Sequence, residues 1–186
     1  MKTDYQNAAR RSELEGLEPI ITQRWSPRAY LSDAPAPADL ARVFEAARLA
    51  PSCYNEQPWH FYTSTEASYQ TFLDLLVQGN QEWAATAPVL GFVATRRSFT
   101  RNGKENYHAD FDAGSAWMAM SLQARALGLY THGMGGIEYD RVYEALRISR
   151  DHWKLLCGFA IGKLDPEGEE ALSQRKPLAD VWTAVA

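Results

Sequence analysis

Residues 110–128 read DFDAGSAWMAMSLQARALG, and this stretch constrains how the rest of the chain can be arranged. It predicts one long helix from about Asp110 to Leu127, closed by Gly128. Apolar residues occur on nearly every side of that helix and not on a single stripe. A helix of this kind is buried, either at the centre of a fold or at a subunit interface.

Around this helix the chain alternates between helical and strand-like patterns. Apolar residues at helical spacing predict helices at about 38–50, 66–79 (ending at Gly79) and 139–148. Short apolar or aromatic runs predict strands at 59–65, 87–95 and 154–164, and the glycine-rich residues 131–140 predict a loop. Intermixed helices and strands indicate an α+β or α/β protein.

The length and composition of the chain limit the classes of function. Its 186 residues suit a single domain, 1–186, with about 1–19 as an arm or short helix. The net charge of −4 argues against a general nucleic-acid binder. Two distant cysteines form no disulfide framework, and no apolar run is long enough to span a membrane. We therefore expect a soluble, cytoplasmic protein.

A basic segment near the start of the chain is one candidate binding site. Arg24, Ser26 and Arg28 alternate along RWSPR, so in an extended chain their side chains point to one side. Arginine forks match phosphate oxygens, which makes the segment a candidate anion site. A solvated basic turn is the alternative. Arg175 and Lys176 join the candidate site only if the fold brings them to it.

A second candidate is the stretch APSCYNEQPWHF, residues 50–61. Ser52, Asn55 and Gln57 offer hydroxyl and amide groups that can pair with the polar edge of a ring. A loop in which the amides satisfy backbone groups is the alternative. A catalytic role for Cys53 lacks a neighbouring base, and the four histidines show no metal-ligand spacing, so no metal is expected.

Together these segments resemble the nitroreductase family of flavoproteins. The resemblance rests on R-x-S-x-R at 24–28, on A-P-S-x-x-N-x-Q-P-W at 50–59 and on the block 110–136. AIGKLDP and RKPL near the end of the chain complete it, so that it covers roughly residues 20–182. It implies an α+β fold with a central, mostly antiparallel sheet flanked by helices, in an intertwined homodimer. It also implies that residues of about 171–186 pack on the partner subunit.

The resemblance implies one FMN in each active site, held at the subunit interface. The loop 51–57 would line the flavin from one subunit, and the arginine set with Ser26 would hold it from the other. The cofactor-binding residues that it implies are Arg24, Trp25, Ser26, Arg28, Pro51, Ser52, Cys53, Asn55, Gln57, Asn80, Met134, Gly135, Gly136 and Arg175. Trp83 stands where some relatives have a lysine, and Cys53 stands where serine is commoner.

The activity that the resemblance implies is an FMN-dependent oxidoreductase. NAD(P)H would give hydride to the flavin N5, and an electron-poor acceptor such as a nitroaromatic, quinone or enone would then take it. The flavin performs this chemistry, so no catalytic side chain is expected. The alternatives are a specialised FMN enzyme, for reductive dehalogenation or flavin destruction, and a non-catalytic FMN-binding protein.

Overall fold

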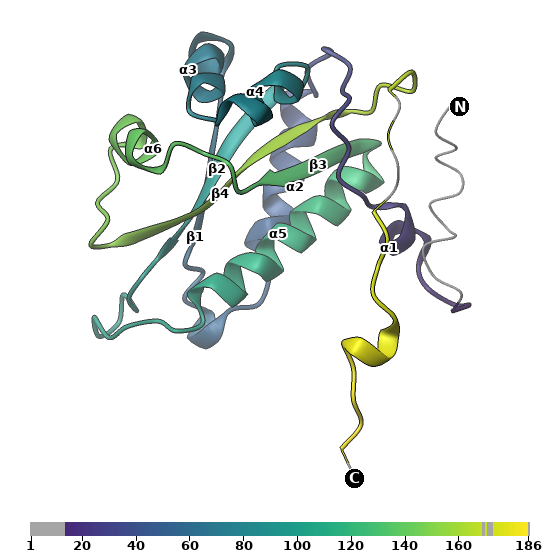
Figure 1. Ribbon diagram of the computed structural model, residues 1–186. Helices are drawn as coiled ribbons and strands as arrows, with labels where there is room; N and C mark the ends of the chain where they lie inside the picture. Colours follow the sequence, from purple (N-terminus) through teal and green to yellow (C-terminus); the bar gives the residue numbers. More distant parts are fainter. Residues whose placement is uncertain (1–13, 169, 171–172, 186) are drawn as a thin grey trace.

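The computed structural model describes residues 14–168, 170 and 173–185, and Figure 1 shows the order of its elements. The helices are α1 (Pro19–Gln23), α2 (Pro37–Arg48), α3 (Tyr69–Asp74), α4 (Gln78–Ala84), α5 (Ala109–Ala126) and α6 (Tyr139–Leu146). The strands are β1 (Trp59–Thr63), β2 (Val89–Arg96), β3 (Leu129–Met134) and β4 (Trp153–Lys163). Short 3₁₀ turns cover Cys53–Asn55, Glu66–Ser68 and Leu178–Asp180.

The described strands form one four-stranded sheet in the order β1-β2-β4-β3. Every neighbouring pair is antiparallel, and a bulge between Val93 and Ala94 shifts the register of β2 on β4. The central strands β2 and β4 are mostly buried because helices cover both faces of the sheet. The expected α+β class with a central antiparallel sheet is confirmed.

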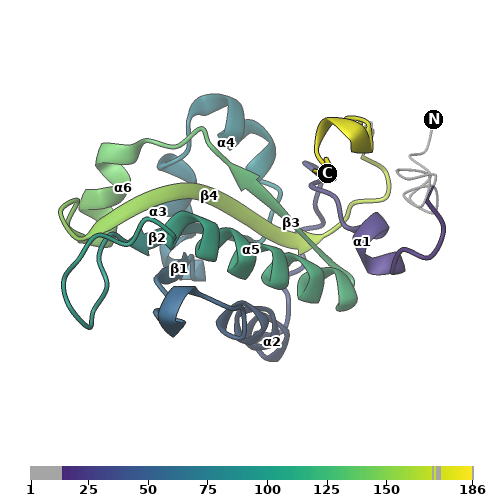
Figure 2. The ribbon, with the colours of Figure 1, turned by 90° about the horizontal axis from the view of Figure 1, so that it is seen from below.

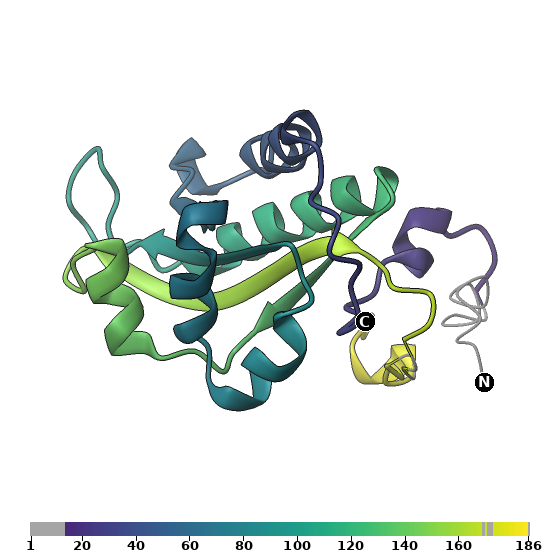
Figure 3. The same cartoon turned by 90° about the horizontal axis from the view of Figure 1, so that it is seen from above.

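Helices cover the two faces of the sheet in separate groups (Figures 2 and 3). Helices α2 and α5 lie on one face, where Val43, Met120 and Phe159 belong to one buried cluster. Helices α3, α4 and α6 lie on the other face, over a cluster that includes Phe72 and Val142. The molecule is therefore a three-layer arrangement with a hydrophobic core on each side of the sheet.

Helix α5 is the central helix that the sequence predicts, and Gly128 follows it with a φ of +76°. Its Met120 is fully buried within this chain. Phe111 and Met118 are 77% and 45% exposed, and they lie seven residues apart, on one side of the helix. The helix is thus central to its own fold and still leaves an apolar stripe uncovered in the single chain.

Two sequence-based expectations are wrong in detail. The helix expected over 66–79 is broken into a 3₁₀ turn, α3 and α4, since Val77 is extended and Leu76 pairs with Ile137. Gly79 consequently lies inside α4 and not at a helix end. The loop expected over 131–140 begins as strand, because Thr131–Met134 pair with β4. Pairing with a distant strand overrides the local glycine signal there.

Helix α1 and residues 173–185 lie on the same side of the molecule (Figure 1). Most of the arm expected at 1–19 lies outside the described residues, which begin at Leu14 and reach α1 at Pro19. Residues 173–185 extend away from the sheet, and Val181 and Trp182 are 70% and 65% exposed. Among the described helices, none is long and apolar enough to cross a membrane.

Candidate functional site

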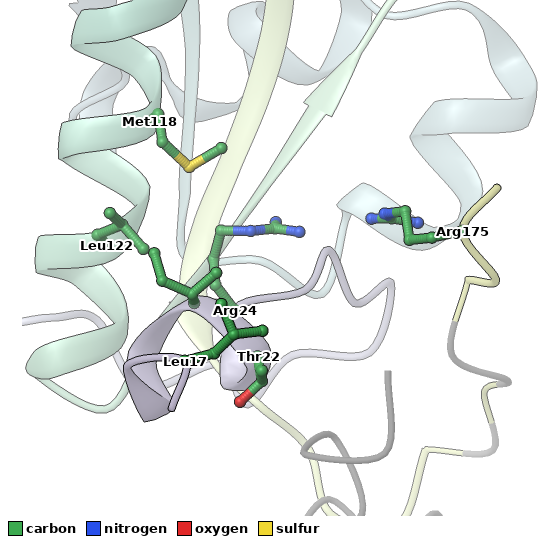
Figure 4. Close-up of a pocket in the computed structure, with 7 residues that line it drawn as sticks. Leu17, Thr22, Arg24, Met118, Leu122 and Arg175 are labelled. Carbon is green, nitrogen blue, oxygen red and sulfur yellow. The ribbon is translucent and has the colours of Figure 1, made fainter. Parts of the chain in front are cut away.

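Arg24 and Arg175 meet at one pocket beside the middle of α5. The pocket has a volume of about 330 Å³ and is lined by Leu17, Ile21, Thr22, Arg24, Met118, Leu122 and Arg175. In Figure 4 the two guanidinium groups extend toward each other from opposite sides of the opening. The Arg175 guanidinium also donates to the backbone carbonyls of Ser173 and Gln174, which steadies its position. The fold thus brings together two cations from opposite ends of the chain.

The electrostatics of this pocket favour an anion. Burial lowers the pKa of Arg24, and the positive charge of Arg175 lowers it further. A guanidinium remains charged at neutral pH even with a lowered pKa. Two like charges that face each other are stabilised by an anion between them, and each fork can bind two oxygens. A phosphate group meets both requirements.

The segment 24–28 is extended, as its alternation predicts. Trp25 and Pro27 are buried, whereas Ser26 and Arg28 are exposed on the other side. The Trp25 ring packs edge-on against Tyr130 at a centroid distance of 6.1 Å. Of the residues expected to hold a cofactor, Trp25 can therefore contribute only its backbone.

Ser26 and Arg28 line a second pocket, together with His132, Glu170 and Ser173. The backbone N–H of Arg28 donates to the Glu170 carboxylate. Arg28 therefore lies in a different pocket from Arg24 and Arg175. The two pockets are close in the chain, because Ser26 and Ser173 each lie two residues from an arginine of the first pocket. The family resemblance implies that all three arginines hold FMN, and in the single chain Arg24 and Arg175 line one pocket while Arg28 lines another.

His132 and Trp83 form an aromatic wall next to Arg28. The His132 ring stacks on Trp83 with centroids 4.5 Å apart, and the Arg28 guanidinium lies 6.0 Å from the Trp83 ring. The His132 Nδ1–H donates to the Pro27 carbonyl at 2.8 Å. Burial lowers the pKa of His132, and the charge of Arg28 contributes in the same direction. The imidazole is consequently neutral at physiological pH.

The glycine-rich turn after β3 is joined to α4 through Asn80. The Asn80 Nδ2 donates to the Gly136 carbonyl at 2.9 Å, and its Oδ1 accepts from the Trp83 indole at 3.3 Å. A Cβ on Gly136 would stand 2.7 Å from Asn80 Nδ2, so glycine is required for this close approach. Met134 is buried, and the space beside Gly135 is open.

The loop 51–57 is tightly held and strained. Ser52 Oγ accepts from the Gln57 backbone N–H at 2.9 Å, and Gln57 Nε2 donates to the Asn55 backbone carbonyl at 3.1 Å. Tyr54, Asn55 and Gln57 all have φ between 50° and 57°. Left-handed conformations in non-glycine residues cost energy and concentrate at functional sites. The hydrogen bonds within this loop are those expected of the alternative, a loop whose amide side chains satisfy backbone groups.

Within one chain this loop does not reach the arginine pocket. The Cys53 backbone N–H donates to Asp112 near the start of α5, whereas Met118 and Leu122 line the arginine pocket further along. Asp112 and Leu122 are about 15 Å apart along the helix axis. The loop 51–57 and the arginine pocket therefore lie at different places along α5.

Sequence reasoning missed His132 as a residue of the site, and it mentioned Trp83 only as a departure from relatives. Tyr130 and Thr131 are residue types that favour strands, and they would have placed His132 in a strand. That signal was hidden by the glycines that surround it. In the described part of the chain, no three His, Cys, Asp or Glu side chains lie together in a group that could hold a metal ion.

The model of the Nitroreductase family matches residues 21–77 and 65–163, so the chain belongs to this family. A crystal structure of an oxidoreductase containing FMN is 39% identical, with a TM-score of 0.85 over 92% of each chain. A protein from Desulfovibrio desulfuricans in complex with FMN is 24% identical, with a TM-score of 0.75 over 92% of this chain and 99% of that one. No curated protein matches the chain.

A third similar structure comes from a described enzyme. The enone reductase CLA-ER, from a gut-bacterial fatty acid saturation metabolism, is 18% identical, with a TM-score of 0.77. The likeness covers 93% of this chain and 99% of that one, and at this identity it supports the fold alone. Several of the similar structures contain FMN. The family and its similar structures support an oxidoreductase.

Proposed function

We propose that the chain is an FMN-dependent oxidoreductase that takes hydride from NAD(P)H and reduces an electron-poor acceptor such as a nitroaromatic, quinone or enone. The observation that carries the proposal is the pairing of Arg24 and Arg175 across one pocket. The 39% identical structure that contains FMN supports the same cofactor for this chain.

The residues present fit FMN. Its phosphate carries close to two negative charges at neutral pH, which two facing guanidinium groups would balance. The Glu170 carboxylate beside the Arg28 backbone would repel a phosphate there. The phosphate is therefore assigned to Arg24 and Arg175. Ser26, Arg28 and Asn80 remain to bind the uncharged polar edge of the ring system.

Bound FMN supplies the hydride-accepting chemistry. The side chains of this protein bind and orient it, and Arg28 provides positive charge beside the pocket. The stacked rings of Trp83 and His132 exclude water from that side, and the neutral imidazole adds no second charge. The proposed reaction therefore needs no side chain that transfers a proton.

A homodimer would complete the site. The loop 51–57 carries the strained backbone and amides expected at a cofactor site, yet it lies away from the arginine pocket of its own chain. A second copy packed along the exposed stripe of α5 would bring its loop to the first chain's arginines. We therefore propose that each site is built from two subunits.

The test is FMN binding by the double variant Arg24→Ala/Arg175→Ala. Hydrogen bonds to charged groups contribute about 1.5–3 kcal/mol each, so loss of both arginines is expected to raise the Kd for FMN at least about 100-fold. Lys176→Ala, beside Arg175 in the same exposed segment, is the matched control and should change the Kd less than about twofold. Fluorescence titration of the purified protein measures both.

Equal affinity in the double variant and the wild type would overturn the phosphate assignment. Oxidation of NADH or NADPH by the wild type, followed by absorbance with a nitroaromatic, a quinone or an enone present, tests the activity separately. A protein that holds FMN but oxidises neither nicotinamide with any of these acceptors would be a non-catalytic flavin-binding protein.

A further inference from the structure

A second polar pocket lies at the start of α5, away from the arginine pair. It has a volume of about 340 Å³ and is lined by Thr95, Arg97, Glu105, Asn106, Tyr107, Ala109, Asp110 and Lys154. None of these residues belongs to the expected FMN site. The ends of β2 and β4 form its floor, and the turn 97–106 closes one side. This turn is ordered by its own bonds, including one from the Asn106 N–H to the Arg97 carbonyl at 2.8 Å.

Asn106 is the unusual residue of this pocket, because it is only 5% exposed. Its Oδ1 accepts from the His108 backbone N–H at 3.1 Å, which fixes the orientation of the amide. The Nδ2 group is then left buried with no hydrogen-bond partner among the described residues. A buried donor without a partner costs about 1–3 kcal/mol. Because Asn106 lines the pocket, an acceptor oxygen that reached this group from the pocket would remove this cost.

The other charged groups of the pocket are already engaged, with the exception of Arg97. Lys154 pairs with Asp110, and the Asp110 carboxylate also accepts from the Thr95 hydroxyl at 3.3 Å. A hydrogen bond from Tyr107 to the Glu105 carboxylate raises the pKa of that tyrosine. In the described part of the chain Arg97 forms no ion pair. Two donors therefore remain for a ligand, the Arg97 guanidinium and the Asn106 amide.

We propose that this pocket binds a small monocarboxylate through Arg97 and Asn106. The planar guanidinium fork matches a planar carboxylate, and the Asn106 Nδ2–H would donate to one of its oxygens. The carboxylates of Glu105 and Asp110 on the rim balance the charges of Arg97 and Lys154. A doubly charged phosphate would be repelled by these acids, whereas a singly charged carboxylate is offset by the Arg97 charge.

The test uses acetate as the probe and the amide NMR spectrum of the purified full-length protein as the readout. Saturable shifts of the Asn106 side-chain NH₂ signals are expected as acetate is added. Asn106→Asp keeps the oxygen that accepts from His108 but replaces the donor with a negative charge, so acetate affinity should fall at least about tenfold. Arg97→Gln should cause a similar loss, and the variant is expected to fold as the wild type does because Arg97 is exposed.

Asn102→Asp is the matched control. Asn102 lies on the same turn, its Oδ1 accepts from the Lys104 backbone N–H at 3.0 Å, and it does not line the pocket. The same change of charge there should leave acetate affinity within about twofold. Three results would overturn the proposal: unchanged Asn106 signals with acetate, which indicate that water alone fills the pocket; equal weakening by Asn102→Asp; or inorganic phosphate binding as tightly as acetate. None of these results bears on FMN binding.

Discussion

At the scale of single residues, burial keeps the imidazole of His132 neutral, and this affects how the stability of the protein depends on pH. The ring lies between the Pro27 carbonyl and the face of Trp83, and Arg28 adds a positive charge nearby. Because burial is the largest cause of its lowered pKa, the folded protein resists protonation of this imidazole. The unfolded chain has no such resistance, and its histidine protonates near pH 6.5.

The stability of the protein should therefore depend on pH through His132. As pH falls below about 6.5 the unfolded state binds the proton first, so the folded state loses stability from that pH downward. His132→Asn should show a smaller fall in Tm between about pH 7 and pH 5 than the wild type. The exposed His152 is the control, and the Tm of His152→Asn should fall over this pH range by as much as the Tm of the wild type. Equal falls for all three proteins would show that His132 makes no contribution.

At the scale of elements, the sequence predicted long regular segments better than junctions. Helices α2, α5 and α6 follow from their apolar spacing, because side-chain periodicity is a local property. The break between α3 and α4 does not, since it depends on Leu76 pairing with Ile137 from a distant part of the chain. The glycines at 133, 135 and 136 likewise predict a loop, and pairing with β4 makes Thr131–Met134 a strand in spite of Gly133.

The junction between α4 and the turn after β3 gives a test with an internal control. In Gly136→Ala the new methyl group would collide with Asn80 Nδ2 and Val77 Cγ2, both at 2.7 Å, and displace the Asn80 bond to the Gly136 carbonyl. Overpacking of this kind should lower the free energy of unfolding by about 1–3 kcal/mol. Gly135→Ala meets open space and should be close to neutral. Denaturant unfolding of the two variants measures the difference, and equal stabilities would contradict the steric argument.

At the scale of the whole molecule, the single chain leaves apolar side chains uncovered. Phe111 and Met118 on α5 are exposed, and so are Leu178, Val181 and Trp182 in the extended tail. Exposed apolar patches of this kind mark interfaces. Met120, two residues from Met118 and on the opposite, buried side of α5, is part of the chain's own core and would report on folding and not on association.

Phe111→Glu is expected to weaken self-association while the chain stays folded, because Phe111 is 77% exposed in the single chain. A charge buried without a partner in a dimer interface costs about 3–5 kcal/mol. Tyr139→Glu, at a 42% exposed position on α6 across the sheet, is the control and should leave association unchanged. Sedimentation velocity over a range of protein concentrations measures both. A Phe111 variant that sediments as the wild type does would place the interface elsewhere.

Features that depend on near neighbours could be predicted from the amino-acid sequence: the apolar spacing of α5, the alternation of Arg24, Ser26 and Arg28, and the family motifs. These follow from side-chain direction and periodicity within a few residues. The folded chain was needed to show that Arg24 faces Arg175, that Arg28 lies apart beside Trp83, and that His132 is neutral. Such features depend on which distant segments the packing of helices against the sheet brings together. Such contacts cannot be predicted from local periodicity, because each of them depends on how many side chains pack together.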